Sequence, residues 1–329
     1  MLRLALLLGL SALGASCGSP PAEPAPAPRP ATVAQADVAP AAPPVSNAEV
    51  PVVAAQAAQA PADTVEAART ETMETFQRIV DRAAAEGVAA RPYGEIVQWV
   101  GEQLRGRPYV AGMLDAPPAE RLVVDLTAFD CVLYVENVLA VARMVALGES
   151  SFEDYADGVR DLRYRDGEVA YCSRLHYFSD WIATNEANGA VENVTAAVGG
   201  EPFEKRISFM SENRGAYRQL VDDAAYACVV DMEAGLAGTA LYYVPQSRIA
   251  EVYDALRPGD VIATATSIGG LDVTQTGFVH KTDGRTGFMH ASLSSDAVKI
   301  SDDLASYVQG ISSQVGIVVA RPLDPRAGG

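Results

Sequence analysis

The stretch Phe129-Asp130-Cys131-Val132-Leu133-Tyr134-Val135-Glu136-Asn137, continued to Leu147 and ended by Gly148, decides the fold of this chain. Its apolar periodicity predicts a helix from Cys131 to Leu147, with Asp130 as the N-cap. Cys131 then lies in the first turn, where the positive end of the helix stabilises a thiolate and lowers the pKa of the cysteine. A cysteine that begins an apolar helix is also a common packing residue. The rest of the sequence has to distinguish a nucleophile from a core residue.

The segments around this helix predict further helices before it and strands after it. Apolar residues recur at helical spacing from Thr64 to about Gly87 and from Tyr93 to Leu104, and Leu122 to Leu126 is typical of a short strand. Residues 152–240 predict helix and loop insertions. After Pro258-Gly259-Asp260, segments rich in Val, Ile and Thr predict strands at 261–266, 271–281, 287–292, 298–300 and 315–321. A helical N-terminal half followed by an antiparallel β half is an α+β fold.

Composition and charge limit the classes of function. The chain has 25 Lys and Arg residues against 42 Asp and Glu residues, a formal net charge of −17 at pH 7. This charge argues against a nucleic-acid partner, because phosphate binding needs Lys and Arg to displace counterions. With 3 His and 4 Cys residues and no Cys-x-x-Cys or His-x-x-x-His spacing, we expect neither a metal site nor a cofactor.

Residues 1–16 predict a secretion signal. Arg3 precedes an apolar run from Leu4 to Leu13, which is shorter than the roughly 20 residues that a membrane-spanning helix needs. Gly14-Ala15-Ser16-Cys17 then resembles the lipobox of bacterial lipoproteins, with Gly14 where leucine is usual, and this predicts lipidation of Cys17. Cleavage that discards Cys17 is the alternative. We expect a membrane-anchored lipoprotein of the cell envelope, facing the periplasm or the exterior.

Residues 17–62 are rich in Ala and Pro and hold no aromatic residue, so they predict a disordered tether. The folded domain is then residues 63–329, which is long enough for a sizeable core. Outside the cytoplasm, Cys172 and Cys228 form either a disulfide or two buried thiols, and the sequence does not distinguish the two.

Several short blocks stand in one order between about residues 75 and 323. They are Pro108-Tyr109-Val110-Ala111-Gly112, Phe129-Asp130-Cys131 with Tyr134-Val135-Glu136-Asn137, Arg163-Tyr164 with Gly167, Ser173-Arg174-Leu175-His176-Tyr177 with Asp180-Trp181, Phe209-Met210-Ser211, Gly259-Asp260, Gly269-Gly270-Leu271-Asp272-Val273, His290-Ala291-Ser292 and the closing Gly316 to Arg321. Together they resemble the DUF1460 family, the N-acetylmuramoyl-L-alanine amidase-like proteins, which are related in fold to the NlpC/P60 papain-like cysteine peptidases.

The resemblance implies a papain-like, NlpC/P60-type core, in which a nucleophilic cysteine begins a helix packed against an antiparallel, barrel-like β-sheet. It also implies a histidine base on one strand and a third, orienting residue on the next. Cys131 matches the nucleophile, His290 the third position, and Tyr109 a tyrosine beside the thiol. The family's base strand reads Gly-Leu-Asp-Val-x-His-x-Gly, and this chain has Gln275 at the histidine position. Glutamine does not take up a proton near neutral pH.

Three interpretations of this departure remain open. His290 or His176 reaches Cys131 and acts as the base. Alternatively, the helix N-terminus holds enough thiolate for slow turnover while Gln275 donates a hydrogen bond to the oxyanion. In the third, the protein binds muropeptides without hydrolysing them. His280 is at an odd offset from Gln275 on the same strand, so we expect it on the other face, as a surface or packing residue.

The block around residue 174 supplies candidate substrate-binding residues. Arg174 is suited to a carboxylate, and Tyr177 or Trp181 to the apolar side of a sugar or peptide. An ion pair of Arg174 with Asp180, and Trp181 in the core, is the alternative, and we keep Trp181 as core.

We take Arg174 and His176 as substrate-binding candidates, together with Tyr109 and with Asp272, which is equally suited to capping a turn. Glu136 lies about 140° around the helix from Cys131, so we expect a structural role for it.

We therefore expect a cysteine hydrolase that cleaves amide bonds of peptidoglycan stem peptides or muropeptides. Cys131 would attack the carbonyl, backbone N–H groups at the helix start would hold the oxyanion, and His290 would by preference carry the proton. A catalytically impaired muropeptide-binding lipoprotein and a thiol-dependent acyltransferase are the alternatives. The expected partners are peptidoglycan fragments or muropeptides and, through the lipid, the membrane, and we expect a monomer.

Overall fold

The computed structural model describes residues 62–117 and 119–327, with side chains from residue 67 onward. The predicted signal sequence 1–16, the predicted lipidation site Cys17 and all but the last residue of the predicted tether 17–62 lie outside the described residues. Among the helices that are described, none is both long enough and apolar enough to cross a membrane.

The helices of the first half begin and end close to the residues that periodicity predicts. In chain order the α-helices are α1 (Ala62–Ala85), α2 (Tyr93–Gln103), α3 (Cys131–Leu147), α4 (Phe152–Arg163), α5 (Phe178–Ala187), α6 (Phe209–Glu212), α7 (Asp223–Gly235) and α8 (Leu304–Gln309). The strong apolar periodicity of α1, α2 and α3 made these three predictable, and α3 runs from Cys131 to Leu147 as expected. The short α8 was not predicted.

The strands form one antiparallel sheet. They are β1 (Val191–Asn193), β2 (Glu201–Pro202), β3 (Tyr242–Pro245), β4 (Val261–Thr266), β5 (Val273–Thr282), β6 (Arg285–Ser292), β7 (Ala297–Ser301) and β8 (Gln314–Pro322). Their order in the sheet is β2-β3-β8-β4-β5-β6-β7, and β1 pairs with β8 outside this path. The α+β class is therefore confirmed. In the described chain no ladder joins the outer strands β2 and β7, so the sheet is not closed into a barrel.

Two sequence predictions fail in the middle of the chain. Residues 122–126 do not form the expected strand, because side chains satisfy their backbone groups instead of a neighbouring strand. Leu126 donates its N–H to Thr72 Oγ1 (3.1 Å), and Arg163 donates to the carbonyl of Val123 (2.6 Å). The region predicted as helix and loop insertions also contains the strands β1 and β2, which are too short to show a period.

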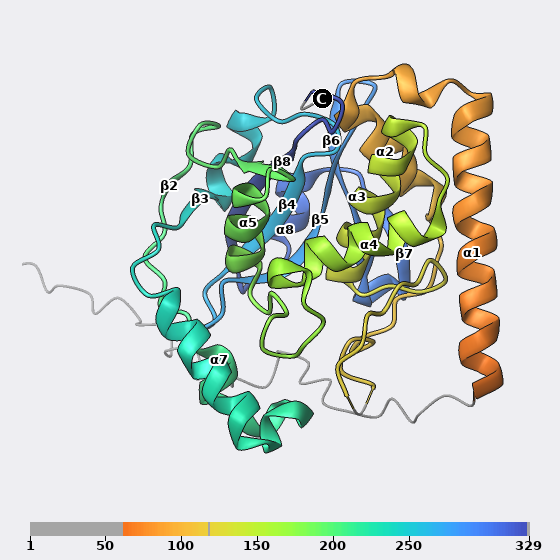
Figure 1. Ribbon diagram of the computed structural model, residues 1–329. Helices are drawn as coiled ribbons and strands as arrows, with labels where there is room; N and C mark the ends of the chain where they lie inside the picture. The colour runs from red at the N-terminus through yellow and green to blue at the C-terminus, as the bar shows by residue number, and fades with distance from the viewer. Residues whose placement is uncertain (1–61, 118, 328–329) are drawn as a thin grey trace, which may run out of the picture. The chain divides into compact units, whose positions relative to one another are not determined.

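Helix α3 is the centre of the first core. Asp130 accepts a hydrogen bond from the Leu133 N–H (2.8 Å), and Gly148 ends the helix in a left-handed conformation (φ 71°). The helix is buried along most of its length by α1, α2 and α4 on one side and by β5 and β6 on the other, as Figure 1 shows. This burial holds the first turn of α3, with Cys131, against the sheet.

The two faces of the sheet carry separate cores. Val261, Ala263, Phe278 and Met289 face α3 and belong to its core. Ile262, Val279 and Phe288 alternate with them along the strands and pack with α8 on the opposite face. Because side chains alternate, each strand residue of the site can be assigned to the α3 face or the α8 face.

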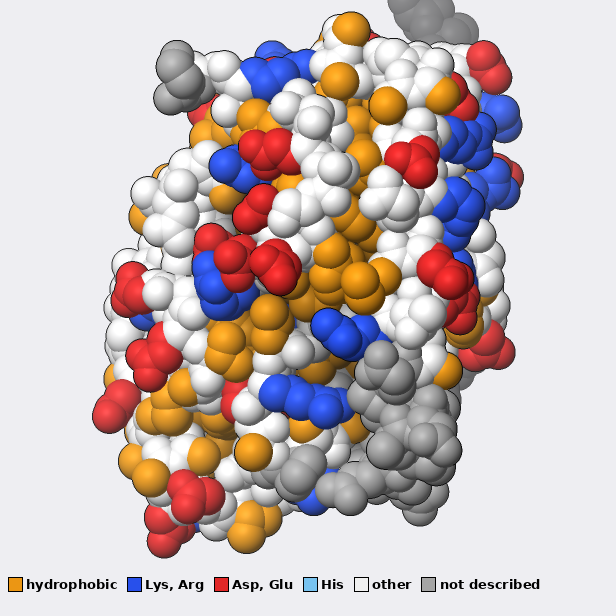
Figure 2. Space-filling view, turned by 45° about the vertical axis from the view of Figure 1, so that its right-hand side comes forward, with side chains coloured by type: hydrophobic (Ala, Val, Ile, Leu, Met, Phe, Trp, Pro, Cys, Tyr) orange, Lys and Arg blue, Asp and Glu red, His pale blue; other side chains and the backbone are white. Residues whose placement is uncertain are grey.

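The surface carries both signs of charge. In the view of Figure 2, acidic and basic side chains are interspersed with apolar ones, and no continuous basic area covers that face. Both signs of charge therefore occur on this face, although acidic residues outnumber basic ones in the whole sequence.

Candidate functional site

Cys131 is the first residue of α3 and lies directly after the N-cap Asp130. The segment before it is fixed by Phe129, which exchanges backbone hydrogen bonds with the chain on either side of Tyr109. Val110 donates to the carbonyl of Phe129 (2.9 Å), and Phe129 donates to that of Pro108 (3.0 Å). Tyr109 is thereby held beside the thiol. Burial raises the pKa of the Tyr109 hydroxyl, and the negative charge of an ionised Cys131 raises it further.

The environment of Cys131 favours the neutral thiol. Cys131 is half-buried, and the surrounding protein excludes enough water that burial raises its pKa to about 11. The carboxylate of Asp130 acts in the same direction, whereas the backbone N–H and hydroxyl of Thr276 lower the pKa. The expectation of a lowered pKa at the helix start therefore does not hold in this structure. Loss of solvent and an adjacent anion outweigh the helix terminus.

Gln275 and His290 are joined in a way that fixes the proton of the imidazole. Gln275 Nε2 lies 2.7 Å from the carbonyl oxygen of Ala291 and 2.9 Å from His290 Nδ1. A carbonyl only accepts, so the amide nitrogen faces Ala291 and its second N–H points to Nδ1. Nδ1 then accepts, and the proton resides on Nε2, which lies 3.3 Å from Ser301 Oγ.

His290 is a neutral, buried residue on the α8 face of the sheet. Its ring stacks on Phe288 (4.6 Å between centroids) and lies 4.7 Å from that of Tyr307 on α8. Burial lowers its pKa to about 4, and the charge of Lys299 contributes. No hydrogen bond joins a histidine ring to Cys131 within the described chain. The structure thus does not bring His290 to the thiol as the proton carrier that we expected.

The other two histidines, His176 and His280, do not contact Cys131 either. His176 Nε2 lies 2.8 Å from the carbonyl of Tyr171, and burial followed by the charge of Arg174 lowers the pKa of His176 to about 3. His176 therefore remains neutral and bound to the backbone rather than to Cys131. His280 lies on the face opposite Gln275, as expected; of the two roles that we allowed, surface or packing, it has the second, because it is buried and pairs with Glu102 of α2 (2.8 Å).

Arg174 is a buried cation beside the loop that leads to the site. It pairs with Asp115 (2.6 Å), lies over the ring of Tyr171 and is 3.7 Å from Glu120. The alternative pair with Asp180 is not formed, because Asp180 binds Arg165 (2.8 Å). Burial raises the pKa of Asp130, and the charge of Asp115 makes a smaller contribution in the same direction. A direct contact between Arg174 and Cys131 is not formed.

The remaining candidates are structural. Asp272 is buried and accepts a hydrogen bond from the Ser179 N–H in the first turn of α5 (2.7 Å). It therefore caps a helix from outside, close to the capping role that the sequence also allowed. Trp181 is fully buried, and Glu136 forms a buried ion pair with Arg163 (2.7 Å), so both have the structural roles that we expected.

Comparison with known proteins identifies the fold that holds these residues. The family model of N-acetylmuramoyl-L-alanine amidase-like proteins matches residues 99–317. The chain belongs to the N-acetylmuramoyl-L-alanine amidase-like family. The DUF1460 resemblance is thereby confirmed.

This amidase-like chain aligns with nearly the whole length of several solved structures. An N-acetylmuramoyl-L-alanine amidase from Bacteroides uniformis ATCC 8492 is 32% identical, with 70% of this chain and 99% of that one covered and a TM-score of 0.67. A proposed xylanase from Bacteroides fragilis is 31% identical, with 68% and 99% covered and a TM-score of 0.63. A DUF1460 protein from Legionella pneumophila, at 18% identity, 78% and 96% coverage and a TM-score of 0.58, shows the fold alone. No curated protein matches the sequence.

Sequence reasoning missed two residues that interact with Cys131 or Gln275. Thr276 follows Gln275, and its buried hydroxyl has no other hydrogen-bond partner in the described chain than the interaction with the thiol. Tyr307 lies on α8, and its hydroxyl interacts with Gln275. The position of Thr276 next to Gln275 was a usable signal. Tyr307 gave none, because its helix is too short to be recognised.

Proposed function

We propose that this amidase-like protein binds peptidoglycan stem peptides or muropeptides at Cys131 and hydrolyses their amide bonds only slowly, because no imidazole takes up the thiol proton. The papain-like, NlpC/P60-type arrangement is part of this proposal. The observation that carries it is the position of Gln275, whose amide nitrogen is bound to both His290 Nδ1 and the Ala291 carbonyl.

The chemistry follows from the groups around the sulfur. A scissile carbonyl placed over the start of α3 would meet the backbone N–H groups there, which can hold an oxyanion. Cys131 would attack as the thiolate, and with a pKa of about 11 only about one thiol in 10⁴ is ionised at pH 7. Loss of a general base typically removes about 10²–10⁴-fold of rate. Binding does not need that base.

We also propose that the protein acts outside the cytoplasm, anchored through Cys17. The predicted signal sequence and lipobox support this location. The disulfide between Cys172 and Cys228 supports it independently, because such bonds persist in oxidising compartments.

A muropeptide digest tests the proposal. The full chain, purified in detergent, is compared with Cys131→Ala, Gln275→His and Gln275→Leu, and products are followed by mass spectrometry while binding is measured by calorimetry. A histidine at 275 can donate to Ala291 or His290 and present its other nitrogen to the thiol. We expect Gln275→His to raise kcat/KM by about 10²–10⁴-fold, Gln275→Leu to give no gain, and Cys131→Ala to bind without cleaving.

The outcomes are separable. Fast hydrolysis by the unchanged chain, matched by Gln275→His, would show that Gln275 does not limit the rate. Hydrolysis that persists in Cys131→Ala would exclude the thiol as nucleophile. Absence of binding by every form would exclude the ligand class.

A further inference from the structure

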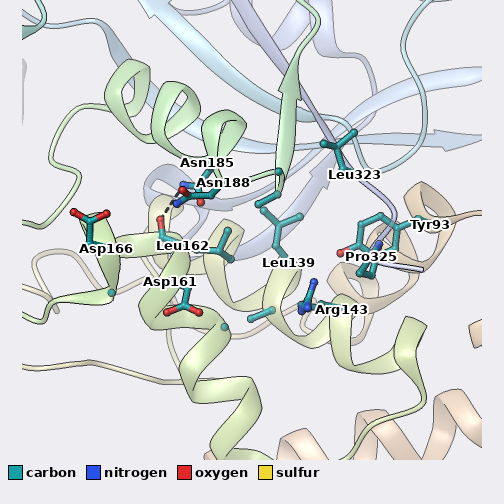
Figure 3. Close-up of a pocket in the computed structure, with 15 residues that line it drawn as sticks. Tyr93, Leu139, Arg143, Asp161, Leu162, Asp166, Asn185, Asn188, Leu323 and Pro325 are labelled. Atoms are coloured by element: carbon teal, nitrogen blue, oxygen red, sulfur yellow. Dashed lines mark hydrogen bonds between the residues drawn. The ribbon is translucent and has the colours of Figure 1, made fainter. Parts of the chain in front are cut away.

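A cavity of about 490 Å³ lies between α3, α4, α5 and the end of the chain, and Cys131 does not line it (Figure 3). Its walls are held in place. Leu323 donates its N–H to the carbonyl of Ala190 (3.0 Å). Arg326 ties the terminal segment to Asp324 and to the carbonyls of Ala89 and Arg91. This volume lies within the range of about 300–1,000 Å³ that is common for small-ligand sites.

One side of the cavity presents hydrogen-bond donors. Arg143, on the outer side of α3, is exposed and forms no ion pair or hydrogen bond with the described residues. Tyr93 is 8% exposed, and its hydroxyl also has no partner in the described chain. Figure 3 shows the Tyr93 side chain pointing into the cavity, with Arg143 on the same side. Burial raises the pKa of the Tyr93 hydroxyl, which therefore keeps its proton, and the charge of Arg143 acts in the opposite direction.

The other side presents acceptors. Asn185 is 1% exposed and uses its amide nitrogen on the carbonyls of Leu162 and Trp181 (both 2.9 Å), which leaves its Oδ1 without a partner in the described chain. Asp166 lines the same side and forms no hydrogen bond or ion pair with described residues. Asp161 is already paired with Arg160 (2.9 Å), which also binds Asp157. The two unpaired charges, Arg143 and Asp166, are therefore opposite in sign and not bound to each other.

We propose that this cavity binds a short zwitterionic peptide, with its carboxylate at Arg143 and Tyr93 and its amine at Asp166 and Asn185. An arginine and a hydroxyl are suited to a carboxylate, and an aspartate and an amide oxygen are suited to an ammonium group. Leu139, Leu162 and Leu323 line the cavity between these groups and offer contact to small apolar side chains. A neutral saccharide would remove water from both charges without replacing it by an opposite charge.

The natural source of such a peptide follows from the proposed function, and the identification of that source rests on the proposed function. Hydrolysis of an amide that carries a stem peptide breaks the C–N bond, adds water and leaves the peptide with a new amine beside its carboxylate. The cavity is thus suited to the class of product that the Cys131 site would release. Binding itself does not require that hydrolysis occurs.

Trialanine, N-acetyl-trialanine and trialanine amide test the site by calorimetry on the full chain. Two variants remove one charge each: Arg143→Gln at an exposed helical position, and Asp166→Asn. Asparagine tolerates the positive φ of residue 166 (55°), so the second variant keeps the backbone. Arg78→Gln on α1, an exposed arginine outside the cavity, is the matched control.

We expect trialanine to bind and the amide and the N-acetyl form each to bind about tenfold more weakly. Arg143→Gln should abolish the difference between acid and amide, and Asp166→Asn the difference between free and acetylated amine, while Arg78→Gln changes neither. Lack of trialanine binding, equal binding of the three peptides, or binding of N-acetylglucosamine in their place would overturn the proposal. Calorimetry of trialanine measures binding and not hydrolysis, so this test can succeed or fail independently of the proposed hydrolysis.

Discussion

The side chain of Gln275 determines which ring nitrogen of His290 carries the proton. The Gln275 amide can only donate to His290 Nδ1, because its other N–H is directed to the Ala291 carbonyl. Gly277 makes this approach possible, since a Cβ there would lie 2.5 Å from the Met289 carbonyl oxygen and 2.8 Å from the His290 Cβ. A histidine at 275 would donate with one nitrogen and leave the other for the thiol. With histidine at position 275 the site could transfer a proton, whereas with glutamine it holds only a fixed hydrogen bond.

The neutral state of His290 predicts a pH dependence of stability. Its pKa in the folded chain is about 4, below the ordinary 6.5, so the unfolded chain binds the proton more tightly between these values. Stability from this group is complete above pH 6.5 and is lost as the pH falls toward 4. Between pH 7 and 5, the wild-type free energy of unfolding should fall by about 2 kcal/mol more than that of His290→Gln.

Urea unfolding at pH 7, 6 and 5 measures this difference. His176 is present in both proteins, so its own lowered pKa cancels in the comparison. Parallel pH profiles for the two proteins would mean that His290 is protonated in the folded chain, and the assigned tautomer would then be incorrect.

At the scale of elements, alternation along β5 was predictable and its irregularity was not. The odd offset correctly separated His280 from Gln275. Between Ala263 and Ala265 of β4, however, the register with β5 shifts, and Thr276 pairs with Ala263 while Val273 pairs with Ala265. Two residues, Thr274 and Gln275, thus stand opposite one. Such a bulge leaves no periodic pattern in the sequence, so the neighbours of Gln275 could be identified only from the structure.

Substitutions of Asp130 can separate the effect of its capping hydrogen bond from the effect of its negative charge. Asp130 caps the helix and also raises the pKa of Cys131. Asparagine caps equally well without the charge, so Asp130→Asn should preserve stability and lower the Cys131 pKa from about 11 by roughly one unit. Asp130→Ala should lower the pKa as well and cost about 1 kcal/mol of stability through the lost cap.

Alkylation of Cys131 by iodoacetamide between pH 7 and 11, read by mass spectrometry of the peptide that contains Cys131, gives these pKa values. The wild-type rate should keep rising about tenfold per pH unit to near pH 11. A plateau near pH 8.5 would instead describe an ordinary exposed thiol and would contradict the buried environment derived for Cys131.

At the scale of the molecule, the fold was more predictable than the site. Long periodic segments fixed α1, α2, α3 and the strands β4 to β8, because burial of one face imposes a period on the sequence. Which residues meet across elements depends on loops and tertiary pairs. Arg174 pairs with Asp115 and not with Asp180, and Asp272 accepts a hydrogen bond from Ser179. No spacing in the sequence indicates either partner. The cavity beside Arg143 likewise combines segments from five parts of the chain.

The disulfide is a long-range constraint that acts mainly on α7. Cys172 and Cys228 are bonded across a separation of 56 residues, which joins the segment of Arg174 and His176 to α7. Figure 1 shows α7 at one side of the molecule, away from α1 and α3. Its contacts come from a small separate core that includes Tyr177, Met210 and Val229. With so little apolar area to hold it, α7 depends on the bond more than the main core does.

Removal of this disulfide should therefore destabilise the chain without altering the surroundings of Cys131. For a loop of this length the entropic effect on the unfolded chain is about 4 kcal/mol, so Cys172→Ser with Cys228→Ser should lower the free energy of unfolding by about that amount. Reduction of the wild type with dithiothreitol should reproduce the loss, and the double variant should not respond to the reductant. Urea unfolding measures both, with Cys131→Ala as the control that keeps the bond. An unchanged midpoint after reduction would mean that α7 is held by its apolar contacts alone.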